Sequence, residues 1–212
     1  YALEEVEKGD LDHWFARVSE KAEMELSMDE LDYKSRGQWL SAAVSPRPLA
    51  LISTRDGERE NIAPITSVSV VSNTPPLVAM SLSQTRDGMK RDTYLNLKEN
   101  GECEIQFLAA NIEAAKDADL AGKPVEHSEW DLLESDGPIH PLAVFVLRCK
   151  LVEDNPLPEG AVARLLILKV ESIIVPSYLP NEDGYSLLCQ HGMDRLTPSP
   201  QDWGHIATHH RS

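Results

Sequence analysis

Residues 45–54 read SPRPLALIST and lead into Arg55-Asp56-Gly57, after which residues 61–64 read NIAP. The apolar run that begins at Leu49 and ends at Thr54 is typical of a buried strand. An Asp-Gly pair directly after such a run favours a tight turn between two antiparallel strands. This stretch therefore predicts a β-hairpin whose second strand begins at Asn61.

Short apolar or alternating runs continue along the chain between proline, glycine and asparagine breaks. They predict strands over residues 68–72, 77–83, 102–108, 142–152 and 162–175. Two short helices interrupt them, one over 93–100 capped by Asp92 and ended by Gly101, the other over 111–121 ended by Gly122. Strands of this length favour a mainly β barrel or sandwich over a parallel sheet.

The composition is that of a folded domain: the chain has 212 residues, of which 42% are apolar and 26% charged. Acids outnumber bases by 35 to 20, and the net charge of −15 disfavours nucleic acid and anionic membranes as partners. No apolar run approaches the roughly 20 residues that span a bilayer, and no export signal is visible. We therefore expect a cytoplasmic protein. Cys103, Cys149 and Cys189 form no CxxC pair and are expected to stay reduced.

The acidic residues are concentrated at the start of the chain, where residues 1–32 hold eleven acids and three bases. Apolar residues recur there at helical spacing behind Asp10, namely Leu11, Phe15, Val18, Ala22 and Leu26. This pattern predicts an amphipathic helix that packs on the body or clasps a dimer. We divide the chain into an acidic N-terminal helical extension (1–32), a β domain (33–175) and a less regular C-terminal tail (176–212) that packs back on the domain.

The common catalytic motifs are absent from the sequence. Without GxGxxG after a strand, GxxxxGK[ST], HExxH or GxSxG, there is no support for a Rossmann site, a P-loop, a zincin or an α/β-hydrolase. His205 and His209 have the i, i+4 spacing of helical metal ligands but lack a third ligand, so no metal site is predicted.

Two other features point to an anionic, polar ligand. Residues 86–93, RDGMKRDT, place three cations at the start of a predicted helix, and helix N-termini beside Lys or Arg bind anions. Small polar side chains suited to a polar ring and a polyol line the preceding strands, namely Asn61, Thr66, Ser67, Ser69, Ser72, Ser81 and Ser83. The alternatives are an internally salt-bridged loop and a water-facing sheet surface.

Four ordered motifs resemble those of the flavin reductase-like family of FMN-binding split barrels: SPRPLALIST at 45–54, NIAP at 61–64, VSNTPP at 71–76 and KRDTYLN at 90–96. The resemblance extends more weakly over residues 33–175. It implies a six-stranded antiparallel Greek-key split barrel with short peripheral helices. It also implies a homodimer that binds FMN in a groove at or beside the dimer interface.

The resemblance further implies which residues hold the cofactor. Residues 61–69 would lie along the isoalloxazine and ribityl chain, residues 90–93 would hold the phosphate, and Arg47 would assist. The expected FMN-binding residues are Arg47, Asn61, Pro64, Thr66, Ser67, Ser69, Ser81, Ser83, Lys90, Arg91 and Thr93.

The function implied is an NAD(P)H-dependent flavin reductase, in which hydride passes from nicotinamide C4 to flavin N5 and reduced flavin serves a partner monooxygenase. This chemistry needs no general acid or base, because the cofactor supplies it. The sequence departs from the family at 188–196, LCQHGMDRL, where an Arg-rich Gly-Gly-x-x-Tyr type element is expected. His191 is the candidate catalytic residue there. The alternative is a flavoredoxin-like FMN protein that carries electrons without a nicotinamide site. NADH and NADPH both remain open as donor.

Overall fold

The computed structural model of the chain describes residues 24–57, 59–84, 91–125, 128–135, 137–177 and 186–199. In chain order the elements are α2 (Tyr33–Ala43), β1 (Arg47–Pro48), β2 (Ala50–Asp56), β3 (Arg59–Ile65), β4 (Ser69–Asn73), β5 (Pro76–Ser83), α3 (Asp92–Asn100), β6 (Glu102–Leu108), α4 (Ile112–Ala121), α5 (Glu129–Leu132), β7 (Ala143–Pro156), β8 (Ala163–Ile174), β9 (Leu188–His191) and β10 (Arg195–Pro198).

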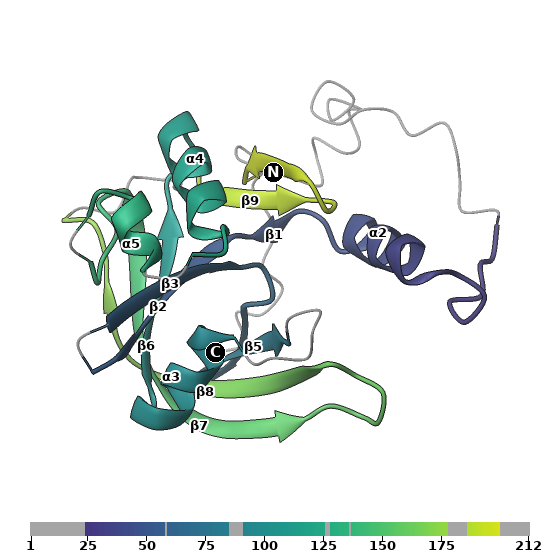
Figure 1. The fold of residues 1–212 in the computed structure, drawn as a ribbon, viewed down its shortest axis with the longest axis horizontal. Helices are drawn as coiled ribbons and strands as arrows, with labels where there is room; N and C mark the ends of the chain where they lie inside the picture. Colours follow the sequence, from purple (N-terminus) through teal and green to yellow (C-terminus); the bar gives the residue numbers. More distant parts are fainter. Residues whose placement is uncertain are drawn as a thin grey trace, which may run out of the picture.

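The expectation of a mainly β, antiparallel fold is confirmed. The larger sheet has the strand order β3-β2-β6-β7-β8-β5-β4, and a smaller one has the order β1-β9-β10. Figure 1 shows the larger sheet curling around a common interior. This sheet has seven strands, one for each strand of the predicted hairpin and one for each of the five further predicted segments, whereas the resemblance implied a six-stranded barrel. Residues 66–68 separate β3 from β4, and these two strands lie at opposite edges.

The predicted hairpin forms β2 and β3. Its register places Thr54 opposite Asn61 and Asp56 opposite Arg59. Gly57 has φ 57°, a left-handed conformation that glycine adopts at little cost and that other residues avoid. The Asp-Gly signal therefore located the turn correctly.

The α3 helix ends where the sequence predicted. Gly101 has φ 73°, and its N–H donates to the Leu97 carbonyl at 2.9 Å. The predicted N-cap is wrong by one residue, since Arg91 occupies the cap position and makes no side-chain cap hydrogen bond. The α4 helix does have a side-chain cap, because the Ala114 N–H donates to Asn111 Oδ1 at 2.8 Å.

Strand alternation gives the sheet two apolar faces, each with its own core. Ala50 and Ile52 of β2 point inward, where they pack with Met80, Ile105 and other buried side chains. On the outer face, Leu51 and Ile62 pack against α4, α5 and β9. The helix α3 contacts β2 and β3 from the inner side, whereas α4 and α5 cover β3 from the outer side.

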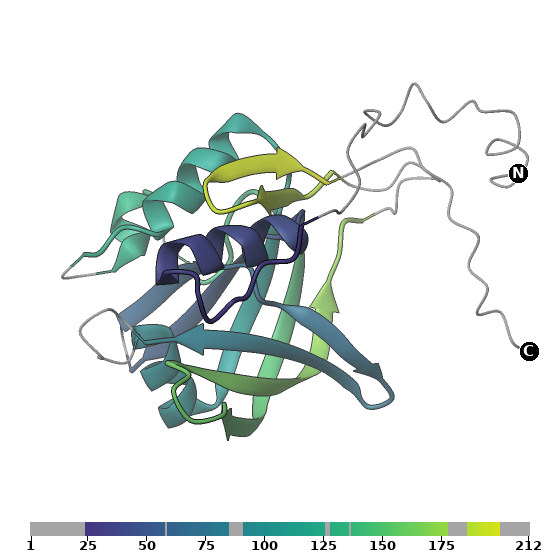
Figure 2. The ribbon, with the colours of Figure 1, turned by 90° about the vertical axis from the view of Figure 1, so that its right-hand side faces the viewer.

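Two described segments differ from the sequence-based expectation. Residues 186–199, expected to be irregular, contain the β9–β10 hairpin, which pairs with β1. The helix α2 was not predicted, although Asp32 caps it by accepting from the Lys34 and Ser35 N–H groups. In Figure 1 and Figure 2 this helix lies outside the curled sheet.

The predicted N-terminal helix falls mainly on residues 1–23, outside the described residues. Residues 24–27 have no helical structure, so the prediction that the helix reaches Leu26 is wrong. None of the described helices is long and apolar enough to cross a bilayer.

Candidate functional site

The start of α3 and the β2–β3 hairpin share a buried polar cluster. The Asn61 side-chain amide lies 3.1 Å from the Thr93 hydroxyl oxygen, and Asn96 Nδ2 donates to Thr54 Oγ1 at 3.2 Å. All four residues are at least nine-tenths buried. With the Asn61 amide oriented so that its oxygen accepts from Thr93, its nitrogen donates to Glu129 Oε2 at 3.3 Å. The cluster therefore fixes α3 against β3.

A second contact joins the end of β5 to the start of α3. Arg91 Nε donates to the Ser83 carbonyl oxygen at 3.0 Å. The cap residue Arg91 makes no side-chain hydrogen bond to the first turn of α3, and a helix N-terminus beside a guanidinium group favours an anion. The other predicted cations of this turn, Arg86 and Lys90, lie outside the described residues.

The predicted serines are not equivalent in the structure. Ser67 Oγ donates to the Ser81 carbonyl at 2.8 Å and accepts from the Ser81 N–H at 3.0 Å, so this hydroxyl ties the β3–β4 connection to β5. Ser69 is exposed on the edge strand β4, where it pairs with Ala79. The hydroxyl-bearing segments thus meet beside β5, while the Ser67 hydroxyl is engaged within the protein.

Alternation along β3 divides the predicted cofactor residues between two faces. Asn61 faces α3 on the inner side, whereas Pro64 and Thr66 line a cavity of about 330 Å³ beside α4 on the outer side. A single ring cannot contact side chains on both faces of one strand. The structure therefore does not bring these three side chains together.

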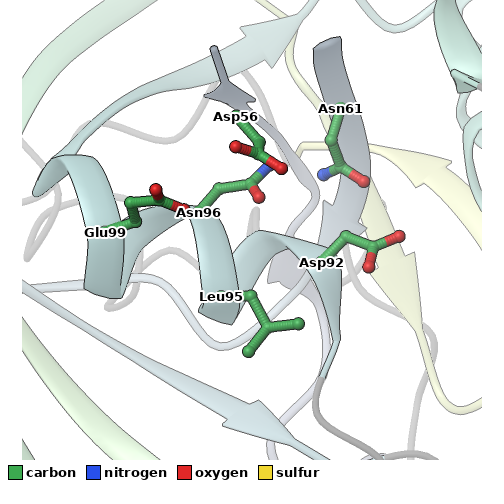
Figure 3. Close-up of a pocket in the computed structure, with 6 residues that line it drawn as sticks. All are labelled: Asp56, Asn61, Asp92, Leu95, Asn96 and Glu99. Atoms are coloured by element: carbon green, nitrogen blue, oxygen red, sulfur yellow. The ribbon is translucent and has the colours of Figure 1, made fainter.

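A cavity of about 310 Å³ lies on the α3 side and is shown in Figure 3. Its lining residues are Asp56, Asn61, Asp92, Leu95, Asn96 and Glu99. Three of these are carboxylates, which repel a phosphate. In Figure 3 the Asp56 carboxylate and the Asn96 amide point toward one another. The carboxylates therefore make this cavity unfavourable for a phosphate.

Arg47 contacts the β9–β10 turn. One of its terminal nitrogens donates to the Gly192 carbonyl at 2.7 Å, and its buried Nε has no hydrogen-bond partner among the described residues. The Gly192 N–H in turn donates to Ser45 Oγ at 2.7 Å. His191, the exposed last residue of β9, lies next to this turn. The structure thus places Arg47 beside the turn that follows His191.

Arg164 is a cation near the candidate site that sequence reasoning missed. With Ser83, Arg91 and Tyr94 it lines a small hollow of about 20 Å³. Its guanidinium donates to the Asp154 carboxylate and lies 5.9 Å from the centre of the Tyr94 ring. No local pattern marks an arginine within an apolar strand as a partner of residues some 70 positions earlier.

Asp154 is the centre of an ionic cluster behind this hollow. The Tyr94 hydroxyl donates to it at 3.0 Å, and Lys98 Nζ lies 3.0 Å away. Burial alone would raise the pKa of Asp154, but hydrogen bonds from Arg164, Lys98 and Tyr94 outweigh it and lower that pKa. The pKa of Tyr94 is raised, first by burial and then by its bond to Asp154. Asp154 therefore stays ionised and orients Arg164.

A buried histidine network on the α4 side was also missed. His140 Nε2 lies 3.2 Å from Asp117 Oδ2, and its Nδ1 accepts from the Leu142 N–H at 3.1 Å. The His140 N–H donates to Gln106 Oε1 at 2.7 Å. Burial lowers the pKa of His140, although Asp117 opposes this effect. The neutral imidazole therefore donates to α4 and accepts from the backbone that leads into β7.

Metal binding has no support within the described residues, where no group of three or more His, Cys, Asp or Glu side chains could hold an ion. The pair of His205 and His209 lies outside the part of the chain that the structure describes.

Comparison with protein families gives one clear match. The model described as "Flavin reductase like domain" matches residues 42–196, which include the β9–β10 hairpin. The match therefore continues past Val175, where the motif resemblance fades.

Two curated relatives match over shorter stretches. The uncharacterized protein YwrF of Bacillus subtilis is 41% identical over 75 residues, covering 35% of this chain and 36% of that protein. An uncharacterized protein of Halalkalibacterium halodurans is 32% identical over 105 residues, covering 49% of this chain and 50% of that protein. The chain thus spans half or less of the length of these relatives.

Solved structures share the fold at low sequence identity. Nitrilotriacetate monooxygenase component B from Bacillus cereus has a TM-score of 0.73 and 19% identity, covering 87% of this chain and 100% of that one. An NADH:FAD oxidoreductase of Streptomyces globisporus has a TM-score of 0.64 and 17% identity, covering 84% and 99%. An FMN-binding protein from Thermus thermophilus has a TM-score of 0.62 and 17% identity, covering 90% and 100%. These likenesses show the fold, that of flavin reductase split barrels.

Proposed function

The chain belongs to the flavin reductase like domain family, and from this premise we propose that it is an NAD(P)H-dependent flavin reductase that binds FMN. Names among its structural neighbours agree with a flavin and a nicotinamide donor, since one is an FMN-binding protein and another an NADH:FAD oxidoreductase. Bound flavin would supply the ring that accepts hydride at N5.

One observation carries the proposal: the Asn61 to Ser83 region and the start of α3 meet at two points. The Asn61 side-chain amide lies 3.1 Å from the Thr93 hydroxyl oxygen, and Arg91 Nε lies 3.0 Å from the Ser83 carbonyl oxygen. These two contacts hold the segments together. They leave the Arg91 guanidinium and the uncapped N-terminus of α3 side by side. A phosphate monoester fits this pair, because both supply N–H donors and positive potential.

Each residue would have a limited task. Arg91, together with Lys90, would hold the phosphate, and the Asn61–Thr93 contact would keep α3 in place. Arg164, fixed by Asp154, would add positive charge on the other side of the hollow. The hydroxyls of Ser81 and Ser83 would bind the ribityl chain. The protein would thus bind and orient the cofactor rather than supply an acid or a base.

The proposal is tested on the purified protein by its visible absorption spectrum and by oxidation of NADH and NADPH with and without added FMN. A flavin reductase shows nicotinamide oxidation that depends on FMN. Absence of both flavin binding and FMN-dependent oxidation would refute the proposal.

A second candidate is an FMN-binding electron carrier that keeps its flavin and has no nicotinamide site. The turn sequence His191-Gly192-Met193 favours it, because this segment lacks the element expected to close on the flavin. In the experiment above, such a protein would be yellow and inert to both nicotinamides.

A homodimer is part of the proposal and is supported by α2. None of the α2 residues is buried, and Tyr33, Trp39 and Leu40 are 79%, 50% and 57% exposed. A helix of 11 residues is marginal in water without tertiary packing. We therefore assign α2 to the contact with a second copy. A partner monooxygenase that takes up reduced flavin is also proposed, in keeping with the name of the Bacillus cereus neighbour.

A further inference from the structure

A small hollow lies where the end of β5, the start of α3 and β8 come together. Its lining residues are Leu82, Ser83, Gln84, Arg91, Tyr94 and Arg164. Two of them are arginines, and none is an acid. The volume of about 20 Å³ is enough for one water-sized group, which needs about 10–15 Å³. The hollow therefore suits an oxygen atom of a small anion rather than a ring.

Arg164 is held in this hollow by a single residue, Asp154. Nε of Arg164 donates to the Asp154 carboxylate, and Nη2 donates to the Asp154 backbone carbonyl at 3.1 Å. Two hydrogen bonds to one residue fix the plane of the guanidinium group. The remaining terminal nitrogen, Nη1, has no hydrogen-bond partner in the part of the chain that the structure describes. Arg164 thus keeps donors for another acceptor in a fixed orientation.

Asp154 is in turn held by α3. The Tyr94 hydroxyl donates to Asp154 Oδ2 at 3.0 Å, and Lys98 Nζ lies 3.0 Å from the same oxygen. The Asp154 side chain is only 10% exposed, so the carboxylate stays with these partners instead of turning toward water. The Tyr94 ring also lies 5.9 Å from the centre of the Arg164 guanidinium. Asp154 therefore links β8 to α3 and keeps Arg164 in one place.

Arg91 reaches the hollow from the start of α3 and is held in a similar way. Its Nε donates to the Ser83 carbonyl at 3.0 Å, while its terminal nitrogens have no partner among the described residues. In the sheet Ser83 pairs with Ala163, and the preceding Leu82 pairs with Arg164. The pairing of β5 with β8 therefore sets the spacing between the two guanidinium groups.

The charges around the hollow leave it cationic. Asp154 carries one negative charge, but both Arg164 and Lys98 bind it. Arg91 adds a further positive charge. Asp92, which follows Arg91, lines the separate cavity shown in Figure 3. In a chain with a net charge of −15, this hollow is thus a place where an anion is attracted rather than repelled.

From this arrangement we infer that Arg164 determines which flavin the protein binds, and that Asp154 is the positioning residue that sets the orientation of Arg164. The inference rests on the proposed function and names its substrate class, a flavin with a terminal phosphate monoester. Such a phosphate carries about 1.5 to 2 negative charges at pH 7 and has three acceptor oxygens, which two fixed guanidinium groups match. Riboflavin has no phosphate. In FAD the phosphate is part of a pyrophosphate diester, which lacks the second negative charge on one phosphorus atom.

The first test compares the dissociation constants of FMN, riboflavin and FAD, measured by fluorescence titration, for wild type and Arg164→Gln. Wild type should bind FMN at least about tenfold more tightly than riboflavin and FAD, because only FMN engages both arginines fully. Arg164→Gln should weaken FMN binding by at least about tenfold and leave riboflavin within about twofold of wild type. Arg148→Gln, an exposed arginine of β7, is the control and should be silent. Unchanged FMN binding by Arg164→Gln, or an equal loss for FMN and riboflavin, would overturn the assignment.

The second test asks whether Asp154 acts through Arg164. Asp154→Asn keeps the shape of the side chain but removes its charge, and should weaken FMN binding by about fivefold or more without affecting riboflavin. When Arg164 is already Gln, the same substitution should cause no further loss, because there is no guanidinium left to position. Losses that add in the double variant would overturn the positioning role. Glu153→Gln, at the adjacent exposed position, is the control.

A milder variant keeps the test independent of folding at Asp154. Tyr94→Phe removes one hydrogen bond to Asp154 and retains the ring, so it should lower the ratio of FMN to riboflavin affinity by about twofold or more. An unchanged ratio would count against the positioning role.

These measurements need no nicotinamide, so the two proposals fail separately. A protein that selects FMN through Arg164 but oxidises neither NADH nor NADPH would refute the reductase and support the role of Arg164. A protein that reduces FMN, riboflavin and FAD and binds all three equally would support the reductase and overturn the role of Arg164.

Discussion

The Asn61 side-chain amide and the Thr93 hydroxyl oxygen lie 3.1 Å apart, although 32 residues separate them in the chain. One residue belongs to the β2–β3 hairpin and the other to the first turn of α3. Both are almost completely buried. This contact joins the two segments on which the proposed cofactor site depends.

Thr93→Val tests the energetic role of this contact, because valine has nearly the same shape but cannot hydrogen-bond. The Asn61 amide would lose a partner in a buried environment, at a cost of about 1–3 kcal/mol in the free energy of unfolding. Urea denaturation measures this loss. Thr74→Val, at an exposed position, should be nearly silent. Equal stability of the two variants would mean that the contact contributes nothing.

Replacing Lys90 and Arg91 together by alanine should weaken FMN binding by at least about tenfold, because two charge-assisted hydrogen bonds to the phosphate are removed. Riboflavin, which lacks the phosphate, should bind with unchanged affinity. Fluorescence titration with both flavins measures the difference. Lys116→Ala, an exposed lysine of α4, is the matched control. Unchanged FMN affinity would remove the phosphate from this turn.

His191→Ala tests whether the turn after β9 takes part in turnover. If the imidazole approaches the reacting rings, kcat/KM for NADH should fall by about tenfold or more while FMN binding stays the same. Steady-state NADH oxidation at saturating FMN provides the measurement. Asp194→Ala changes the same turn without removing the imidazole. Normal turnover of His191→Ala would exclude a catalytic role.

The His140 network predicts a pH-dependent stability. Burial lowers the pKa of His140 in the folded protein below its ordinary 6.5, so between these two values the unfolded chain binds more protons. Stability is therefore fully present above pH 6.5 and declines as the pH falls toward the folded-state pKa. His140→Asn should reduce the difference in unfolding free energy between pH 7.5 and pH 5.5, measured by urea denaturation. An unchanged difference would assign the pH dependence to other groups.

The exposed apolar residues of α2 predict a concentration-dependent dimer. Replacing Trp39 and Leu40 by serine should raise the dimer dissociation constant by at least about tenfold. The reason is that the variant buries less apolar surface when two copies associate. Size-exclusion chromatography with light scattering gives the mass. Ile112→Ser removes a similarly exposed apolar side chain from α4 and serves as the control. A monomeric wild-type protein would contradict the assignment of α2.

Local sequence signals predicted the helices and strands whose ends are marked by a turn or cap residue. Asp56-Gly57 located the β2–β3 turn, and Gly101 located the end of α3, because each position needs a left-handed backbone that glycine adopts readily. The start of α2 is also marked by a local signal, because Asp32 is a typical N-cap residue. The helix could therefore have been predicted from the sequence.

The site could be predicted only in part. The motifs indicated that the Asn61 strand and the Arg91 turn belong to one site. In the structure Asn61 contacts Thr93 of α3, and Arg91 contacts Ser83 of β5. Arg164 and the His140–Asp117 pair carried no such pattern, because their partners are set by strand order and helix packing. Arg47 does belong to a motif, but its contact with Gly192 spans 145 residues and was likewise not predicted.

By itself the sequence determined an antiparallel β domain, its turns and the family to which its motifs are similar, because backbone preferences and side-chain alternation act between near neighbours. Tertiary structure alone decided which face of β3 each polar side chain occupies and which cations lie together. It also decided that the β9–β10 hairpin closes a cavity against α4. Those outcomes depend on pairing between distant strands, where contact energies rather than local propensities select the partner.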